Sequence, residues 1–391
     1  MEFQFDCPKN LFTMDAIKVL IIDENILVRR AITTILQQRE EFRVFWLIDE
    51  FDTVETVIRN TSPDIILLSL ENIEGEGLDI LQKIRSTFNN LPIVVISPRN
   101  QEGAKAAITA LRLGAIDFIT KPESKNLILF AERHLKKRLE PLITAIYEMR
   151  QPKNLDKLML ESLTQPQKSF EDFRTGVKDQ QSIEIVVMGG CTGGVQALFS
   201  ILSYLPKDLA IPLVVVQHLP RTYTEYLATC LDAFCKIPVR EVKNGEKLKA
   251  GTVYIAPGGY QCEISQSFSD IVASVHRGPR ENNMRPSIDV LFRSAAKIYG
   301  NKTLGVLLSG CGCDGLGGAK EIKKHSGQII VQDPRSSIAP DLPLSAISQG
   351  LTKTYCTPQN IAQQITKHSL FIGRDYYNNQ EKEVINTNFL F

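Results

Sequence analysis

The chain has 391 residues, enough for two domains that each bury a core of their own. Hydrophobic residues make up 43% and charged residues 23%, and the formal net charge of +1 provides neither a basic surface for nucleic acid nor an acidic tail. No apolar run reaches the roughly 20 residues of a membrane-spanning helix, and the N-terminus lacks the basic-then-apolar order of a secretory signal, so we expect a cytoplasmic protein that inserts into no membrane.

The first part of the chain alternates strand and helix patterns. Apolar runs that predict five strands lie at 18–23, 43–48, 63–70, 92–97 and 117–122, and amphipathic stretches separate them. This alternation indicates a doubly wound, five-stranded parallel sheet of the flavodoxin type. A helical pattern then runs from 126 to about 150, and the polar stretch 151–180, with two prolines, is typical of a linker.

Polar residues stand where the strands of this first sheet end. Asp23 and Glu24 end the first strand, Ser97 ends the fourth, and Lys121 follows the fifth. In phosphorylated switch domains, carboxylates at such strand ends hold Mg²⁺ and accept a phosphoryl group, which a lysine and a hydroxyl then detect. In this order and spacing, residues 16–145 resemble a response-regulator receiver domain, and LGAIDFITKP is a close match to that family.

The receiver resemblance fails at one position. The phosphoacceptor aspartate of that family belongs at the end of the third strand, and the matching residue is Ser69. A serine hydroxyl cannot form an acyl phosphate, and the change also removes a negative metal ligand. Glu71 lies past the strand end, and we do not expect it to substitute. The resemblance therefore implies a pseudo-receiver that is not phosphorylated at this site.

A second α/β series begins at Ile183. Apolar runs that predict strands lie at 185–188, 213–218, 252–257, 303–310 and 328–333, and helical patterns follow the first strand, span 316–324 and recur near Ala346. These elements predict a second doubly wound parallel sheet.

The stretch IEIVVMGGCTGGVQAL, residues 183–198, predicts a strand, a tight turn and a helix, with Cys191 at the bend. Such a bend exposes a side chain above the sheet, and the helix N-terminus favours the thiolate form of a cysteine. Eight cysteines in a chain of this length do not indicate a disulfide framework. One alternative for Cys191 is therefore that it is a small buried hydrophobic residue without a catalytic role. Another is a phosphate-binding loop, but the turn has no lysine and no acidic ribose partner follows at the usual distance.

Two further polar residues end strands of the same predicted sheet. His218 ends the strand at 213–218, and Asp314 lies in the loop SGCGCDGLGGAKEI after the strand at 303–310. There Asp314 can orient the imidazole or serve as the N-cap of the helix at 316–324. A nucleophile, a base and an orienting carboxylate at three strand ends predict acyl transfer. The remaining histidines, which we expect at the surface, are His134, His276, His325 and His368.

Five separated segments within about residues 183–365 carry a family resemblance. They are IVVMGGCTGGVQAL, VVVQHLP, VYIAPGG, NNMRPSIDVLF and LLSGCGCDGLGG. In this order they resemble the signature segments of chemotaxis protein-glutamate methylesterases of the CheB type, in which a receiver domain and a linker come first. The resemblance implies hydrolysis of glutamate methyl esters on methyl-accepting chemoreceptor proteins, deamidation of certain glutamines, a chemotaxis histidine kinase as a second partner, and no cofactor.

The same resemblance implies the roles of individual residues. The serine, histidine and aspartate of the family's triad match Cys191, His218 and Asp314, and Thr192 and the backbone of Cys311 match positions that support the oxyanion. From the sequence patterns and the resemblance together, we expect an N-terminal extension at 1–15, a receiver-like domain at 16–145, a linker at 146–181, a methylesterase domain at 182–370 and a flexible tail at 371–391.

Several positions depart from the family pattern. Besides Cys191 for serine, Cys311 stands for a methionine, Tyr260 for a histidine, and PDLP at 340–343 for a glycine–methionine–proline segment. A thiol in a pocket shaped for serine favours esters over amides as substrates. Two alternatives stay open. One is a non-catalytic scaffold or sensor in a chemosensory array, and the other is a metal or redox site built from Cys191, Cys311, Cys313 and His218.

Overall fold

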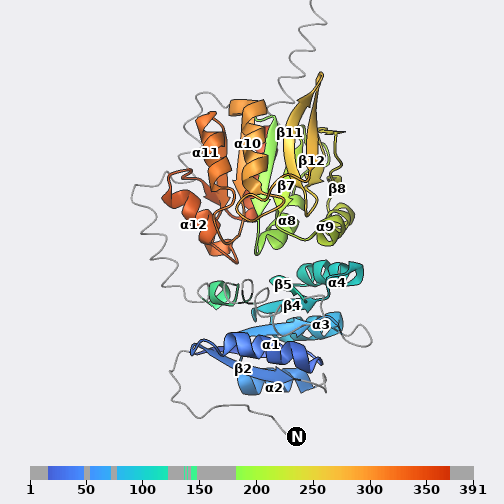
Figure 1. Ribbon diagram of the computed structural model, residues 1–391, viewed down its shortest axis with the longest axis vertical. Helices are drawn as coiled ribbons and strands as arrows, with labels where there is room; N and C mark the ends of the chain where they lie inside the picture. Colours follow the sequence, from blue (N-terminus) through green and yellow to red (C-terminus); the bar gives the residue numbers. More distant parts are fainter. Residues whose placement is uncertain are drawn as a thin grey trace, which may run out of the picture. The chain divides into compact units, whose positions relative to one another are not determined.

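The computed structural model describes residues 16–47, 53–71, 77–121, 136, 139, 142–147 and 182–369. The chain divides into two compact units, Met1–Pro152 and Lys153–Phe391, each of which is described by itself (Figure 1). Most of the helix predicted at 126–150 lies outside the described residues, as do the predicted linker at 151–180 and the tail at 371–391. The domain limits given above stay predictions.

The first unit is a parallel sheet with the strand order β2-β1-β3-β4-β5, which confirms the predicted fold class. Every residue of β3 and β4 is buried, which explains their uninterrupted apolar sequences. The strands are β1 (Ile17–Ile22), β2 (Phe42–Leu47), β3 (Ile65–Ser69), β4 (Ile93–Ser97) and β5 (Asp117–Thr120). The named helices between them are α1 (Ile26–Leu36), α2 (Val54–Thr61), α3 (Gly77–Thr87) and α4 (Gln101–Arg112).

The second unit contains a parallel seven-stranded sheet with the order β15-β14-β13-β6-β7-β10-β8. Its strands are β6 (Ile185–Gly190), β7 (Leu213–Gln217), β8 (Val239–Glu241), β10 (Val253–Ile255), β13 (Thr303–Leu307), β14 (Gln328–Gln332) and β15 (Tyr355–Cys356). Its named helices are α8 (Gly194–Leu202), α9 (Arg221–Phe234), α10 (Ile288–Tyr299), α11 (Leu316–Lys324) and α12 (Asp341–Ser348), with 3₁₀ turns at Gly300–Lys302 and Pro334–Ser336. Because β6, β7 and β13 are adjacent and parallel, their C-terminal ends meet at one edge.

A small antiparallel sheet in this unit was not predicted. It pairs β11 (Gln261–Ser267) with β12 (Asp270–His276), and β12 with β9 (Glu246–Lys247). The strand β11 alternates apolar with polar residues, and β12 is half-exposed and contains only the three-residue apolar run 271–273, so neither shows the long apolar run of a buried strand.

The antiparallel sheet and α10 share a core with the large sheet. Cys262, Ile264 and Ala273 of the hairpin lie in one buried cluster with Phe292 of α10 and Tyr254 of β10. Full burial of a side chain the size of Phe292 contributes about 2–3 kcal/mol to stability. This shared core fixes the loop between β12 and α10, which reaches the site described below.

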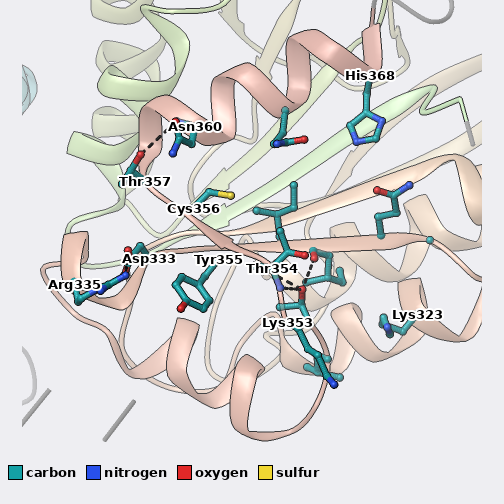
Figure 2. Close-up of a pocket in the computed structure, with 17 residues that line it drawn as sticks. Lys323, Asp333, Arg335, Lys353, Thr354, Tyr355, Cys356, Thr357, Asn360 and His368 are labelled. Carbon is teal, nitrogen blue, oxygen red and sulfur yellow. Dashed lines mark hydrogen bonds and ion pairs between the residues drawn. The ribbon is translucent and has the colours of Figure 1, made fainter. Parts of the chain in front are cut away.

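At the β15 edge of the large sheet lies a cavity of about 580 Å³, bounded by β14, β15 and the helix at 358–369. Figure 2 shows Asn360 and His368 on that helix, with Lys353 and Lys323 across the strands from it. The expectation that His368 lies at the surface is wrong, because its side chain faces this edge and is only 8% exposed. Among the described helices, none combines the length and the apolar character needed to cross a bilayer.

Candidate active site

Cys191 lies at the bend between β6 and α8. Its N–H donates to the carbonyl of Ser309 (3.0 Å), and its carbonyl accepts from the N–H of Gly194 (3.0 Å) and from Nε2 of Gln217 (2.6 Å). The residue is partly exposed. These bonds hold the thiol at the edge where the parallel strands end, as the sequence predicts.

The turn after Cys191 depends on glycine. Gly193 has φ +76°, and a Cβ atom there would lie 2.6 Å from Ser309 Oγ and 2.6 Å from Ile338 Cβ. A larger residue would be strained by its backbone and by both neighbours. The tight strand–turn–helix geometry therefore follows from the sequence GGCTGG.

His218 directly follows β7 and pairs with Asp314. Its Nε2 lies 2.8 Å from Asp314 Oδ2, and the side chains are 7% and 5% exposed. Burial, the largest influence, would lower the pKa of the imidazole, but the hydrogen bonds and negative charges of Asp314 and Cys191 outweigh it and raise that pKa to about 9. The structure thus joins His218 to Asp314 and brings Cys191 close enough to influence the same imidazole.

Besides His218, several other donors hydrogen-bond the carboxylate of Asp314. Its Oδ1 accepts from Ser287 Oγ (2.7 Å), Asn282 Nδ2 (2.9 Å) and the N–H of Asp289 (3.3 Å), and its Oδ2 accepts from the N–H of Ile288 (2.8 Å). Burial would raise the pKa of Asp314, but the bond to His218 and these donors lower it. The carboxylate is therefore held ionised and in a fixed orientation.

The suggestion that Asp314 caps α11 is wrong. The N-cap of α11 is Gly315, with no side-chain cap, whereas Asp314 accepts N–H groups at the start of α10. Asp289 ties the two helices together, because its Oδ1 accepts from the N–H groups of Gly315 (3.0 Å) and Gly318 (2.5 Å). Asp314 accepts from the N–H groups of α10 and does not cap α11 because α10 begins beside the loop that carries Asp314.

Four positioning residues were not singled out from the sequence. They are Gln217, Asn282, Ser287 and Asp289. The segment NNMRPSIDVLF, which carries the last three, was among the family segments, and Gln217 immediately precedes His218. Their partners lie in other loops of the fold, so their individual roles could not be read from sequence spacing.

The predicted support residues lie around the same edge. The carbonyl of Thr192 accepts from Ser309 Oγ (2.7 Å), and the residue is partly buried. A Cβ atom at Gly310 would lie 3.0 Å from Cys191 Cβ, so the loop that leads to Cys311 passes directly beside the nucleophile. The Cys311 thiol hydrogen-bonds the carboxylate of Asp341, at the start of α12.

The thiols do not assemble a metal site in the part of the chain that the structure describes. Cys311 is partly exposed and Cys313 is exposed. Among described residues, no group of three or more His, Cys, Asp or Glu side chains is gathered as a metal ion requires. No described geometry favours the metal alternative.

In the first unit, the strand ends bring Asp23, Ser69 and Lys121 together. The Lys121 Nζ lies 3.4 Å from Asp23 Oδ2, 3.1 Å from Ser69 Oγ and 2.6 Å from Oε2 of Glu71. Asp23 is 1% exposed. Ser97 is fully buried at the end of β4, and Glu24 is partly exposed next to Asp23. Lys121 is therefore paired with carboxylates although an aspartate is missing at Ser69.

Comparisons with known proteins agree with this architecture. The chain matches the CheB methylesterase family over residues 186–365 and the response regulator receiver domain family over residues 19–131. It is 35% identical to a protein-glutamate methylesterase/protein-glutamine glutaminase of Trichodesmium erythraeum, over 90% of this chain and 99% of that protein. It is 32% identical to a protein of the same name from Pyrococcus horikoshii, over 90% of this chain and 93% of the relative.

Among solved structures, the CheB methylesterase catalytic domain of Thermotoga maritima is 35% identical, with a TM-score of 0.47, over 48% of this chain and 99% of that domain. The two full-length relatives exceed 30% identity over nearly their whole length. The chain therefore belongs to the protein-glutamate methylesterase/protein-glutamine glutaminase family.

Proposed function

We propose that this protein hydrolyses glutamate methyl esters on chemoreceptor proteins, with Cys191 as the nucleophile, and that it deamidates glutamines at such sites more slowly. The observation that carries the proposal is the buried His218–Asp314 pair, joined at 2.8 Å, whose imidazole lies close enough to Cys191 for that residue to help raise its pKa. A protonated imidazole beside a thiolate is the resting form suited to a cysteine nucleophile.

In the first half-reaction, the Cys191 thiolate attacks the ester carbonyl carbon and a carbon–sulfur bond forms. The carbonyl oxygen becomes an oxyanion, and we assign its stabilisation to the Thr192 side chain and the backbone N–H of Cys311. Collapse of this intermediate breaks the bond to the methoxy oxygen, which takes the proton of His218 and leaves as methanol. The product is a thioester on Cys191.

In the second half-reaction, the charge of the thiolate is gone. Because the bond and charge of Cys191 both help to raise the pKa of His218, the thioester lowers that pKa and makes the ring a base. The neutral ring takes a proton from water, the resulting hydroxide attacks the thioester, and glutamate and thiolate are released. An amide must expel ammonia instead of methanol, so deamidation is expected to be slower.

The receiver-like unit supports a separate proposal about control. Ser69 provides no carboxylate for phosphorylation, and Lys121 is already paired with Asp23 and Glu71. We infer that esterase activity is uncoupled from phosphorylation by a histidine kinase. The missing phosphoacceptor also favours the alternative of a non-catalytic scaffold. A measurement of ester hydrolysis must therefore distinguish an active esterase from a scaffold.

The test is methanol release from methylated chemoreceptor by the full-length chain. Wild type should release methanol, and Cys191→Ala should fall to the rate without enzyme. Iodoacetamide should alkylate Cys191 ahead of the exposed Cys313. Equal rates for wild type and Cys191→Ala would exclude the esterase and leave the scaffold.

A further inference from the structure

A tyrosine surrounded by arginines lies next to the triad. The guanidinium carbons of Arg221 and Arg277 each lie 5.3 Å from the ring centroid of Tyr260. Both side chains also donate to the Tyr260 hydroxyl, at 3.2 Å and 3.3 Å. The hydrogen bond of Arg277 and the charges of Arg221, Arg277 and Arg285 lower the pKa of the phenol. We call these four residues the arginine platform.

Arg221 connects the arginine platform to His218, because the turn between β7 and α9 joins the two residues. Arg221 is the third residue after His218 and begins α9. Gly258 packs on this turn so closely that a Cβ atom there would lie 2.5 Å from the Leu219 carbonyl oxygen and 2.5 Å from the Arg221 nitrogen. Tyr260 is two residues further along. The aromatic ring is therefore fixed beside the turn that carries the catalytic imidazole.

Arg285 connects the arginine platform to Asp314, because it lies in the loop whose Asn282 hydrogen-bonds that carboxylate. The N–H of Gly259 donates to the Arg285 carbonyl at 2.9 Å, and Asn282, three residues before Arg285, donates to Asp314. Arg285 also donates to the carbonyl of Gly278 at 3.0 Å. The positive charges thus share a rim with the triad and are supported by the same loops.

Within the described part of the chain, the arginines of the platform form no salt bridge, and the charge of Arg221 acts on the carboxylate of Glu241. Arg221 and Arg277 are exposed, and each donates there only to the neutral hydroxyl of Tyr260. Their guanidinium carbons are no more than about 11 Å apart, since each is 5.3 Å from one centroid. Each guanidinium carries five N–H donors in a fork that matches a carboxylate. Most of these donors are therefore available to a ligand.

Other arginines stacked on tyrosines behave differently. Arg240 lies 5.2 Å from the Tyr254 centroid and pairs with Glu246 at 3.0 Å. Arg335 lies 6.0 Å from the Tyr355 centroid and pairs with Asp333 at 3.0 Å. The absence of a direct salt bridge distinguishes the arginine platform from these internal pairs within the described residues.

We propose that the arginine platform binds carboxylates of an acidic helical segment in the protein substrate, one or two turns from the esterified glutamate. The proposal rests on the proposed function and specifies its substrate. A glutamyl methyl ester is uncharged, so the triad itself gives no electrostatic attraction to it. Glutamates three or four residues away on a helix lie about 5–6 Å from the ester position and can reach the neighbouring rim. Such pairs select acidic substrates and speed their association.

The experiment compares two helical peptides that carry one glutamyl methyl ester. One has glutamates at the flanking positions, and the other has glutamines there. Wild type should show a kcat/KM about tenfold higher for the glutamate peptide, at about three- to fivefold for each exposed ion pair. In Arg221→Ala/Arg277→Ala the ratio should approach one, and 0.5 M NaCl should reduce the wild-type ratio in the same direction. The matched control, Arg240→Ala, should keep the wild-type ratio.

Binding separates this proposal from the esterase proposal. Fluorescence anisotropy of labelled, unesterified versions of both peptides measures Kd with the full-length chain and requires no turnover. If no methanol is released but the double variant loses preference for the glutamate peptide, the arginine platform stands and the proposed reaction fails. If the double variant keeps the wild-type ratios of kcat/KM and of Kd, or if wild type shows no preference in either, the arginine platform is not a carboxylate site.

Discussion

Replacing Cys191 by serine tests whether the thiol sets the protonation state of His218. Burial, the largest influence on that ring, lowers its pKa, and the bonds and charges of Asp314 and Cys191 together raise it to about 9. A serine hydroxyl is neutral near pH 7, so the variant keeps only the contribution of Asp314. We therefore expect the pKa of His218 to be lower in Cys191→Ser than in wild type.

The size of the effect follows from the pKa. With a value of about 9, only about one His218 ring in a hundred is neutral at pH 7. The rise from 6.5 to about 9 corresponds to roughly 3 kcal/mol in favour of the protonated ring. Wild type uses this proton to expel methanol, so its kcat/KM should fall as the pH passes 9. The serine variant needs a neutral base, so its kcat/KM should rise with pH, with a midpoint below 9.

The assay is methanol release from a glutamyl methyl ester peptide between pH 6 and pH 10. Cys191→Ala at each pH gives the background. Opposite slopes above neutral pH support a thiolate–imidazolium pair in wild type. Superimposable pH profiles for cysteine and serine would refute the reasoning, because Cys191 would then have no influence on His218.

Three further predictions follow from the same contacts. Asp314→Asn should lower kcat/KM by about 10²- to 10⁴-fold. Urea unfolding should show that the wild-type stabilisation by the protonated His218, present in full below pH 6.5, is lost as the pH rises through 9, and this dependence should be weaker in the variant, in which only Cys191 still raises the pKa. Acetyl phosphate should leave the wild-type rate unchanged, since Ser69 accepts no phosphoryl group, and a severalfold increase would contradict this. Hydrogen peroxide should inactivate wild type reversibly, with recovery in dithiothreitol, whereas Cys191→Ser should resist it.

The juxtaposition of Cys191, His218 and Asp314 could be predicted because parallel strands end at a common edge. Cys191 and His218 each follow directly on an apolar run that forms a strand, and Asp314 lies in the loop after a third. Three adjacent strands then bring the residues together, whatever the details of the loops. Local periodicity was enough for this part of the fold.

The surroundings of the triad depend on contacts that local patterns do not encode. Asn282 and Ser287 reach Asp314 across more than 25 residues of sequence, which only the tertiary fold specifies. The hairpin β11–β12 was missed because its strands are half-exposed and mixed in polarity. His368 was misplaced because its helix, at 358–369, packs at the edge of the sheet and buries the side chain.

The most direct test of the thiol mechanism is detection of the acyl-enzyme. Full-length protein is acid-quenched during turnover of a glutamyl methyl ester peptide, digested, and examined by mass spectrometry. We predict that the fragment containing Cys191 carries the glutamyl peptide as a hydroxylamine-sensitive thioester, and that Asp314→Asn accumulates less of it. Steady methanol release with no acyl group on Cys191 at any quench time would contradict the account.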